Sequence, residues 1–430
     1  MRVAVIGAGW AGMAAAVAAA SAGHQVTVFE ASRELGGRAR GIAGSMPGAD
    51  HTALDNGQHI LIGAYCETLG LMSKVGVNVH ASLLRMPLAM RFPDGTGLLL
   101  PNWTAPLDAA AGILTAKGWS ARDKLTLLRA AMRWRRQKFQ CSQHESVLDV
   151  CHDLSPRVMQ QLIEPLCVSA LNTPAEKSSG EIFLRVLQDA LFSKGHEGFG
   201  GSNLLLPRRD LSSLFPLPAA QWLGRSACRT LTGRRIETLQ AVSGQWRVDS
   251  EPFDRVVLAC PAREAARLAQ ASGCASPEWI DLACGLEHAA ITTVYLAGGP
   301  RLALPMLALH SGPTAPAQFV FDRSQLGGPR GMLAFVVSAS QGERQALQTQ
   351  VVAQAQALGW QGLVPVQTVV EKRATFVCTP GVTRPQTLVA PGLLACGDYV
   401  QGPYPATLEG AVRSGLAAAQ MLARAGNAPA

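Results

Sequence analysis

The first thirty residues contain the feature that most constrains the fold: a glycine-rich turn between a short apolar strand and an alanine-rich helix. Gly7, Gly9 and Gly12 form the pattern GxGxxG after an expected strand over 2–6, and a helix is expected over about 9–22. The first glycine permits a tight turn, the second lets the backbone approach a pyrophosphate, and the third lets helix and strand pack closely. The helix N-terminus offers N–H donors and a positive dipole to phosphates. The segment therefore predicts a dinucleotide-binding β-α-β unit.

The second strand of this unit, over 25–30, ends at Glu30. A carboxylate at this place accepts hydrogen bonds from ribose hydroxyls and disfavours a 2′-phosphate. Residues 3–29 contain no Asp, Glu, Lys or Arg, so a membrane span or a signal peptide is an alternative. The interspersed glycines favour strand, turn and buried helix instead.

Gly36, Gly37 and Arg38 follow directly. This GGR stretch resembles FAD proteins of the amine-oxidase and phytoene-desaturase type. The resemblance implies that the two glycines let the backbone turn against the FAD pyrophosphate and that Arg38 neutralises it. The alternative for Arg38 is an ordinary surface cation. With GxGxxG, the stretch favours FAD over a plain nicotinamide dinucleotide.

The C-terminal part carries a matching pattern, with Gly397 and Asp398 after a buried strand and a helix that begins near Thr407 and Leu408. It resembles the second FAD signature of the same superfamily. The resemblance implies that Asp398 accepts from the ribitol hydroxyls, and that N–H groups at the helix start face the flavin and stabilise negative charge on it. The alternative is an ordinary strand–turn–helix. No flavin-linking cysteine motif is visible, so FAD is expected to bind non-covalently.

Nucleotide-type elements occur at the start, near 255–260 and at the end, with helical and antiparallel material between them. We expect an α/β fold in which a Rossmann-type FAD-binding domain carries an inserted α+β substrate domain. The FAD-binding domain is assigned to 1–80, 205–265 and 370–430, and the substrate domain to 81–204 and 266–369. A strand over 233–236 is expected to pair with adenine near Ile236, a strand over 256–261 to run beneath FAD, and residues 105–200 to be mostly helical.

The string Asp55-Asn56-Gly57-Gln58-His59 is the most distinctive one. With PRRDLSSLFPLPAAQWL from Pro207, EKRATF from Glu371 and GDYVQGPYPATLEGAVRSG from Gly397, it closely resembles the squalene-associated FAD-dependent desaturases, the hydroxysqualene dehydroxylase family. The resemblance spans the chain. It implies reduction of hydroxysqualene by reduced flavin to squalene and water, a step of squalene and hopanoid biosynthesis.

The candidate residues follow from these motifs. His59 is the candidate proton donor or hydroxyl binder, although a structural histidine is the alternative. Gln58 orients His59 or touches the flavin, and Tyr404 and Tyr399 line the flavin face or simply pack there. The residues expected to bind the cofactor are Gly7, Gly9, Ala11, Gly12, Glu30, Ala31, Gly37, Arg38, Asn56, Gly57, Ile236, Gly397, Asp398, Thr407 and Leu408.

Three other functions are compatible with the same motifs. The first is an FAD-dependent desaturase that oxidises a polyisoprenoid, because the motifs do not fix the direction of redox chemistry. The second is an amine oxidase, which is disfavoured because no lysine stands in a flavin-adjacent motif. The third is a non-redox prenyl-lipid carrier, against which the complete FAD motifs argue.

Partners are inferred from charge and substrate class. The net charge is +8, and residues 121–138 alone hold seven basic residues and one Asp. A hydrophobic C30 substrate resides in a bilayer, so we expect a cytoplasmic protein attached peripherally to the inner face of the cytoplasmic membrane, with Trp134 at the headgroups. A solvated basic helix is the alternative. Nucleic acid and metal are not expected, the ten cysteines form no CxxC pair, and no second nucleotide motif identifies the electron donor.

Overall fold

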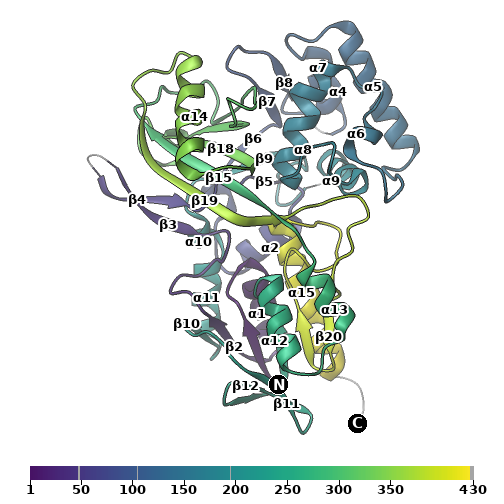
Figure 1. The fold of residues 1–430 in the computed structure, drawn as a ribbon, viewed down its shortest axis with the longest axis vertical. Helices are drawn as coiled ribbons and strands as arrows, with labels where there is room; N and C mark the ends of the chain where they lie inside the picture. Colours follow the sequence, from purple (N-terminus) through teal and green to yellow (C-terminus); the bar gives the residue numbers. More distant parts are fainter. Residues whose placement is uncertain (47–48, 104, 194, 427–430) are drawn as a thin grey trace.

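The computed structural model describes residues 1–46, 49–103, 105–193 and 195–426. Two lobes are stacked along the long axis of the molecule (Figure 1). The lower lobe holds the N-terminus and a parallel sheet. The upper lobe combines an antiparallel sheet with a cap of helices beside it.

The lower lobe is built on a six-stranded sheet in the order β10-β2-β1-β14-β21-β20. Its strands are β1 (Arg2–Ile6), β2 (Gln25–Glu30), β10 (Arg229–Thr232), β14 (Arg255–Leu258), β20 (Leu388–Ala390) and β21 (Leu393–Ala395). All neighbours pair in parallel except β20 with β21. Three separate parts of the chain therefore supply one sheet, and the predicted α/β fold class is confirmed.

Helices cover both faces of this sheet, as the burial of β1 indicates. Val3 and Val5 belong to one apolar core and Ala4 and Ile6 to another, since successive side chains of a strand point to opposite faces. The lobe's helices are α1 (Trp10–Ser21), α2 (Cys66–Lys74), α3 (Val79–Ser82), α10 (Leu211–Leu214), α11 (Pro216–Gly224), α12 (Ala262–Ala271), α13 (Pro277–Cys284) and α15 (Leu408–Gly426). A small sheet follows β10, with β11 (Leu239–Val242), β12 (Gln245–Val248) and β13 (Glu251–Phe253).

The uncharged segment 3–29 forms β1, α1 and β2, as predicted. None of the helices in the described ranges is long and apolar enough to cross a membrane.

The upper lobe has an antiparallel sheet in the order β16-β17-β18-β15-β19. Its strands are β15 (His288–Ala297), β16 (Met306–Ala308), β17 (Phe319–Asp322), β18 (Leu333–Ser340) and β19 (Val364–Phe376), with a 3-10 turn at Arg323–Leu326 and helix α14 (Arg344–Ala357) packed on it. Three small sheets of short strands link the lobes. In the first, β3 (Gly41–Met46) pairs with β4 (Ala49–Asp55). In the second, β9 (Leu204–Pro207) lies between β5 (Leu61–Ile62) and β6 (Leu83–Met86), and in the third β7 (Ala89–Arg91) pairs with β8 (Gly97–Leu99).

The helical cap confirms the prediction for 105–200. It consists of α4 (Leu107–Thr115), α5 (Ala121–Arg136), α6 (Val147–Val150), α7 (Pro156–Val158), a π-helical segment (Met159–Ile163), α8 (Glu164–Leu171) and α9 (Gly180–Phe192). Trp134 was predicted to face lipid headgroups, and this is wrong. The side chain is buried and its indole N–H donates to the Val150 carbonyl at 3.0 Å, because it lies on the face of α5 that packs into the cap.

Two further expectations differ from the structure. Residues 233–236 do not form a strand, since β10 ends at Thr232 and the chain continues in an irregular extension. The boundary assigned at 370 falls inside β19, which pairs with β15 as far as Phe376. A strand held along most of its length by one partner belongs to that partner's sheet.

Helices α1 and α15 approach each other closely enough to exclude side chains between them. A Cβ atom on Gly415 would lie 2.3 Å from the Ala11 carbonyl oxygen and 2.9 Å from the Ala15 nitrogen. Both neighbours are backbone atoms of α1, which cannot give way as a flexible side chain does. Gly415 therefore sets how closely α15 packs on the helix that follows the glycine-rich turn.

We predict that Gly415→Ala lowers the free energy of unfolding by about 2 kcal/mol or more, because the added methyl group overpacks the α1–α15 contact. Gly224→Ala is the matched control, since a Cβ atom there meets nothing within 4 Å and the exchange is expected to be neutral or slightly stabilising. Thermal unfolding of both variants measures the difference. Equal melting temperatures would show that α15 can move away without cost.

Candidate functional site

A cavity of about 510 Å³ extends between the two lobes. Almost all the residues predicted to bind a cofactor or substrate line it, with Gly12 and Tyr404 as the exceptions. The predicted residues that do so are Gly7, Gly9, Ala11, Glu30, Ala31, Gly37, Arg38, Asn56, Gly57, Gln58, His59, Ile236, Gly397, Asp398, Thr407 and Leu408. The fold thus brings motifs from both ends of the chain to one place.

The glycine-rich turn has the shape that its sequence predicts. Gly7 has a φ of +117°, and a Cβ atom on Gly12 would lie 2.0 Å from the Gly7 carbonyl oxygen, so Gly12 serves packing rather than binding. Gly9 precedes α1 and supplies no side-chain acceptor to the helix N–H groups. These donors face the cavity without a capping partner and fit a pyrophosphate.

Gly37 brings a second loop against this turn. A Cβ atom on Gly37 would lie 3.2 Å from the Gly9 Cα atom, and the Gly36 N–H donates to the Ala8 carbonyl at 3.0 Å. Neither loop places a side chain between its backbone and the cavity here. The two glycine segments therefore form one backbone-lined cradle.

Glu30 is held at the end of β2 by its neighbours. One carboxylate oxygen accepts from the Ala8 N–H at 2.7 Å and the other from the Ser32 N–H at 2.8 Å. Each carboxylate oxygen can accept a second hydrogen bond, which fits ribose hydroxyls. Arg234 and Ile236 line the same cavity although they do not form a strand, so the position predicted for Ile236 holds while its conformation does not.

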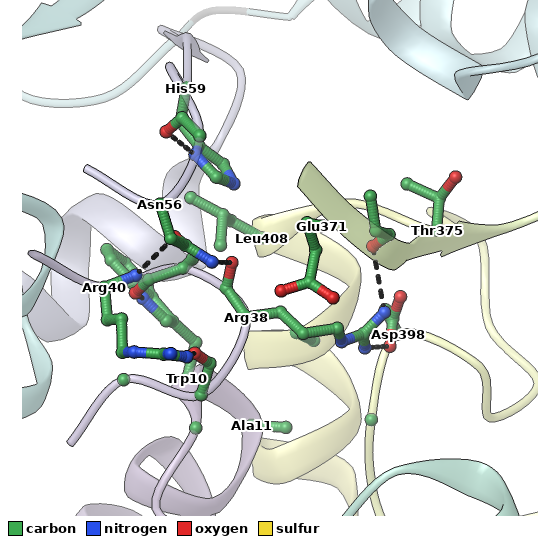
Figure 2. A pocket seen from close by; sticks show the side chains of 18 of the residues that line it. Trp10, Ala11, Arg38, Arg40, Asn56, His59, Glu371, Thr375, Asp398 and Leu408 are labelled. Carbon is green, nitrogen blue, oxygen red and sulfur yellow. Dashed lines mark hydrogen bonds and ion pairs between the residues drawn. The ribbon is translucent and has the colours of Figure 1, made fainter. Parts of the chain in front are cut away.

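Arg38 and Asp398 form an ion pair that the sequence motifs did not predict (Figure 2). Arg38 also donates to the Ala374 carbonyl of β19 at 3.0 Å. The Gly397 N–H donates to the Ser414 hydroxyl at 2.8 Å and so orients the turn that carries Asp398. The pair joins the GGR loop to the C-terminal motif and places both charged groups on the cavity wall.

The DNGQH string forms the loop between β4 and β5. Figure 2 shows the Asn56 amide between the Arg38 and Arg40 backbones, accepting from the Arg40 N–H at 3.1 Å and donating to the Arg38 carbonyl at 2.7 Å. The His59 Nδ1 lies 2.7 Å from the Gly57 carbonyl oxygen. Burial, with the nearby charge of Arg38, lowers the pKa of His59, so the ring is neutral at pH 7. A neutral ring that donates from Nδ1 presents Nε2 as a hydrogen-bond acceptor.

Gln58 and Tyr404 were predicted to act near His59 and the flavin. The Gln58 side chain instead accepts from the Arg323 guanidinium at 3.0 Å, and no hydrogen bond to His59 is found in the described ranges. Tyr404 does not line the cavity, because its hydroxyl donates to Asp189 of α9 and the Arg413 guanidinium lies 4.8 Å from its ring centre. Tyr399 lines the cavity, and its buried hydroxyl has no partner within the described part of the chain.

The upper lobe supplies the part of the cavity wall that sequence motifs missed. Its apolar residues come from the second sheet and its polar residues from α8, β18 and β19. They are Ser169, Ala170, Asn172, Ile291, Phe319, Phe321, Val336, Ser338, Glu371, Ala374 and Thr375. Alternating apolar strands carry no motif, so among these residues a visible signal existed only for Glu371, Ala374 and Thr375, which belong to the string EKRATF.

Glu371 and Asn172 differ in how they are engaged. Figure 2 shows the Glu371 carboxylate in the pocket, where the one hydrogen bond that it accepts from the described residues comes from the Arg373 N–H at 3.4 Å. Asn172, with a left-handed φ of 50°, accepts from the Ala339 N–H at 2.5 Å and donates to the Thr375 hydroxyl at 3.0 Å. Asn172 therefore ties α8 to the sheet, whereas Glu371 retains acceptor capacity toward the cavity.

Comparisons with known proteins point to flavoenzymes. The family described as flavin containing amine oxidoreductase matches residues 10–423. The hydroxysqualene dehydroxylase of Rhodopseudomonas palustris is 29% identical over 99% of this chain and 99% of its own length. That of Zymomonas mobilis is 26% identical over 97% of this chain and 98% of its own length. Zeta-carotene desaturase of Synechocystis is 41% identical over 19% of this chain and 16% of its own. An oxidoreductase from Methanosarcina mazei has the same fold, with a TM-score of 0.73 at 17% identity over 98% of this chain and 100% of its own.

Glu30→Ala is expected to weaken FAD binding roughly tenfold or more, because the ribose hydroxyls lose a charged acceptor and the Ala8 N–H loses its partner. Glu34→Ala is the control, since Glu34 is exposed and only forms an ion pair to Arg40 at 3.6 Å. Titration of each apoprotein with FAD gives the dissociation constants. The same constant for both variants would place the ribose elsewhere.

Asp55 provides a pH-dependent stability test. Burial raises its pKa to about 7, and the Oδ2 atom has no partner among the described residues. Because an unfolded aspartate titrates near ~4, this carboxyl's contribution to stability falls as pH rises from about 4 to 7, by up to about 4 kcal/mol. Asp55→Asn removes this titration and keeps an acceptor for the Leu211 N–H. We expect its melting temperature to rise relative to wild type between pH 5 and pH 8, whereas exposed Asp281→Asn keeps a constant offset.

Proposed function

The chain belongs to the flavin containing amine oxidoreductase family, and on this premise we propose that it converts hydroxysqualene to squalene by FAD-dependent reductive dehydroxylation. The observation that carries this choice of reaction is the extent of similarity. Hydroxysqualene dehydroxylases match 97–99% of the chain, whereas zeta-carotene desaturases match 18–19%. Similarity to the dehydroxylases therefore includes both the FAD-binding segments and the substrate lobe.

The cavity is suited to an isoprenoid alcohol. Ile291, Phe319, Phe321 and Val336 present apolar side chains from the second sheet, which suits a hydrocarbon chain. Polar side chains interrupt this apolar wall, among them His59, Asn172 and Glu371. An apolar patch beside hydrogen-bonding groups suits a hydrocarbon chain that carries a hydroxyl.

The proposed reaction balances with one proton and one hydride. The allylic C–O bond breaks, the hydroxyl takes a proton and leaves as water, and the carbon accepts a hydride, which reduced FAD supplies when bound. The allylic cation is delocalised, so the protein's task is to hold the alcohol, deliver the proton and exclude bulk water. An electron donor must restore the reduced flavin after each cycle.

His59 and Glu371 are assigned different tasks in this proposal. Because the pKa of His59 is lowered, its ring is mostly unprotonated at pH 7 and is a poor proton donor. We assign its free Nε2 atom the task of accepting a hydrogen bond from the substrate hydroxyl, which positions the substrate. Glu371 is a cavity carboxyl without an ion pair in the described ranges, and we assign the proton delivery to it. Asp398 is less suited to this task, because it is already engaged in the ion pair with Arg38.

Polyisoprenoid desaturation is the second candidate. It is favoured by the 41% identity to zeta-carotene desaturase over 83 residues, although this segment is short. In that reaction the substrate would be oxidised and the flavin reduced, the reverse of the proposal. The non-redox carrier has no support, since the matched family consists of oxidoreductases.

The direction of electron flow separates the two candidates. We expect that reduced protein mixed anaerobically with hydroxysqualene regains the absorbance of oxidised flavin and yields squalene. If the flavin stays reduced while oxidised protein bleaches with squalene or another polyisoprenoid, desaturation replaces the proposal. Lipid extraction and mass spectrometry identify the product in each case.

One test variant and one control variant examine the role of Glu371 in this experiment. Glu371→Gln is expected to slow reoxidation by roughly a hundredfold, the usual contribution of a general acid. Glu343→Gln changes a carboxyl at the start of α14, remote from the cavity lining, and is expected to react as wild type does. Normal rates in both variants would remove Glu371 from the mechanism.

A further inference from the structure

Helix α5 presents an unusual exposed stripe. Leu127, Ala130 and Trp134 are buried on the face that packs into the cap. The opposite face follows the spacing i, i+3, i+7, i+10, i+14, so its members lie on one side of the helix. All five are exposed and alternate between arginine and apolar side chains: Arg122, Leu125, Arg129, Met132 and Arg136.

Helix α4 and the segment before it extend this surface with apolar side chains. Leu107 and Leu114, seven residues apart on α4, are 63% and 60% exposed, and Trp103 is 63% exposed. The two helices are neighbours in the cap (Figure 1), and the Lys124 ammonium of α5 donates to the Leu114 carbonyl at 2.7 Å. We call Trp103 and the exposed residues of α4 and α5 the cap surface.

The cap surface carries positive charge and contains no acidic residue, and beside it Asp153 pairs with Arg133 of α5 at 2.9 Å. Asp108 and Asp123 are the only acidic residues between Pro101 and Gln140, and both are buried. Asp108 accepts from the Ser202 hydroxyl at 3.0 Å, and Asp123 forms a capping box with Ser120. Each of these two acids thus serves the fold, and the exposed residues of α4 and α5 are cations, apolar side chains and Thr115.

Exposed apolar residues are concentrated in this part of the molecule. Seven of the twelve strongly exposed large apolar side chains of the described residues lie between positions 103 and 192. The remaining five are scattered over the lower lobe and the second-sheet part of the upper lobe, and they do not form such stripes. A concentration of this kind on a folded protein marks a binding surface.

We infer that the cap surface docks on an anionic lipid bilayer. The apolar side chains would enter the headgroup–acyl boundary while the interleaved arginines pair with lipid phosphates. A stripe that alternates cations with apolar groups suits this environment better than a protein interface core, from which charges are depleted. The inference rests on surface residues alone and does not depend on the proposed reaction.

The location of the cap surface fits delivery of an apolar molecule to the cavity. Ser169 and Ala170 of α8 line the cavity and belong to the same helical cap as α4 and α5. The cap lies beside the second sheet, away from the lower end of the FAD-binding lobe (Figure 1). A bilayer on the cap would leave the dinucleotide-binding sheet in solvent.

Vesicle co-sedimentation of the full-length holoprotein tests this inference. Wild type should bind vesicles of phosphatidylcholine with phosphatidylglycerol at low salt, and bind less at high salt or to phosphatidylcholine alone. The basic variant Arg122→Gln/Arg129→Gln/Arg136→Gln and the apolar variant Leu125→Ser/Met132→Ser should each reduce the partition coefficient about tenfold or more.

Matched controls change the same residue types elsewhere. Arg225→Gln/Arg263→Gln/Arg344→Gln removes three exposed charges, and Leu217→Ser/Leu388→Ser removes two exposed leucines; both should bind as wild type does. Retention of bound flavin verifies folding of every variant. The inference is overturned if wild type does not bind anionic vesicles, if controls and cap variants lose binding equally, or if the cap variants only dissociate a dimer. Hydroxysqualene turnover is not part of the readout, so failure of the proposed reaction leaves this result unaffected.

Discussion

The close approach of three backbone segments around the first turn is the constraint on which the cofactor site depends. Gly12 packs against the Gly7 carbonyl, Gly37 against Gly9, and Gly415 of α15 against the Ala11 carbonyl, each at a distance that excludes a side chain. These contacts fix the N-terminus of α1 at the cavity with its N–H groups free of side-chain caps. The N–H groups at this turn thus suit an anion through backbone geometry, and Arg38, Arg40 and Arg234 line the same cavity.

Polar contacts connect the loop that carries the DNGQH string to the upper lobe. The Tyr295 hydroxyl of β15 donates to the Asp55 carbonyl at 2.8 Å, and Arg323 donates to Gln58 at 3.0 Å. Tyr295 lies in the second sheet and Arg323 in the 3-10 turn that follows β17, so the loop that carries His59 is positioned in part by the upper lobe. The buried Asn56 side chain instead binds the Arg38 and Arg40 backbones within its own lobe, so both lobes hold the DNGQH string in place.

The motif-based predictions were more accurate for residues whose contacts are close in the sequence than for residues whose contacts are distant. Glu30 and Asn56 form hydrogen bonds with backbone groups within 22 positions of themselves along the chain, and both line the cavity as their motifs indicated. Tyr404 was placed wrongly because its partner Asp189 lies 215 positions away, and Gln58 lines the cavity as predicted but is bound by Arg323, 265 positions away, rather than by His59. The same limit applies to Phe319 and Val336, whose apolar sequence surroundings carry no motif for the cavity that they line.

The sequence by itself determined the cofactor class and the fold class. The glycine spacing, the strand-terminal Glu30 and the C-terminal Gly397–Asp398 pair act through backbone conformation, which is encoded locally. Only the tertiary structure decided which side chains face the cavity, which are tied elsewhere, and that Trp134 points inward while Arg129 and Met132 point outward. The reason is physical: a helix or strand fixes the relative directions of its side chains, but packing against distant elements chooses which face is buried.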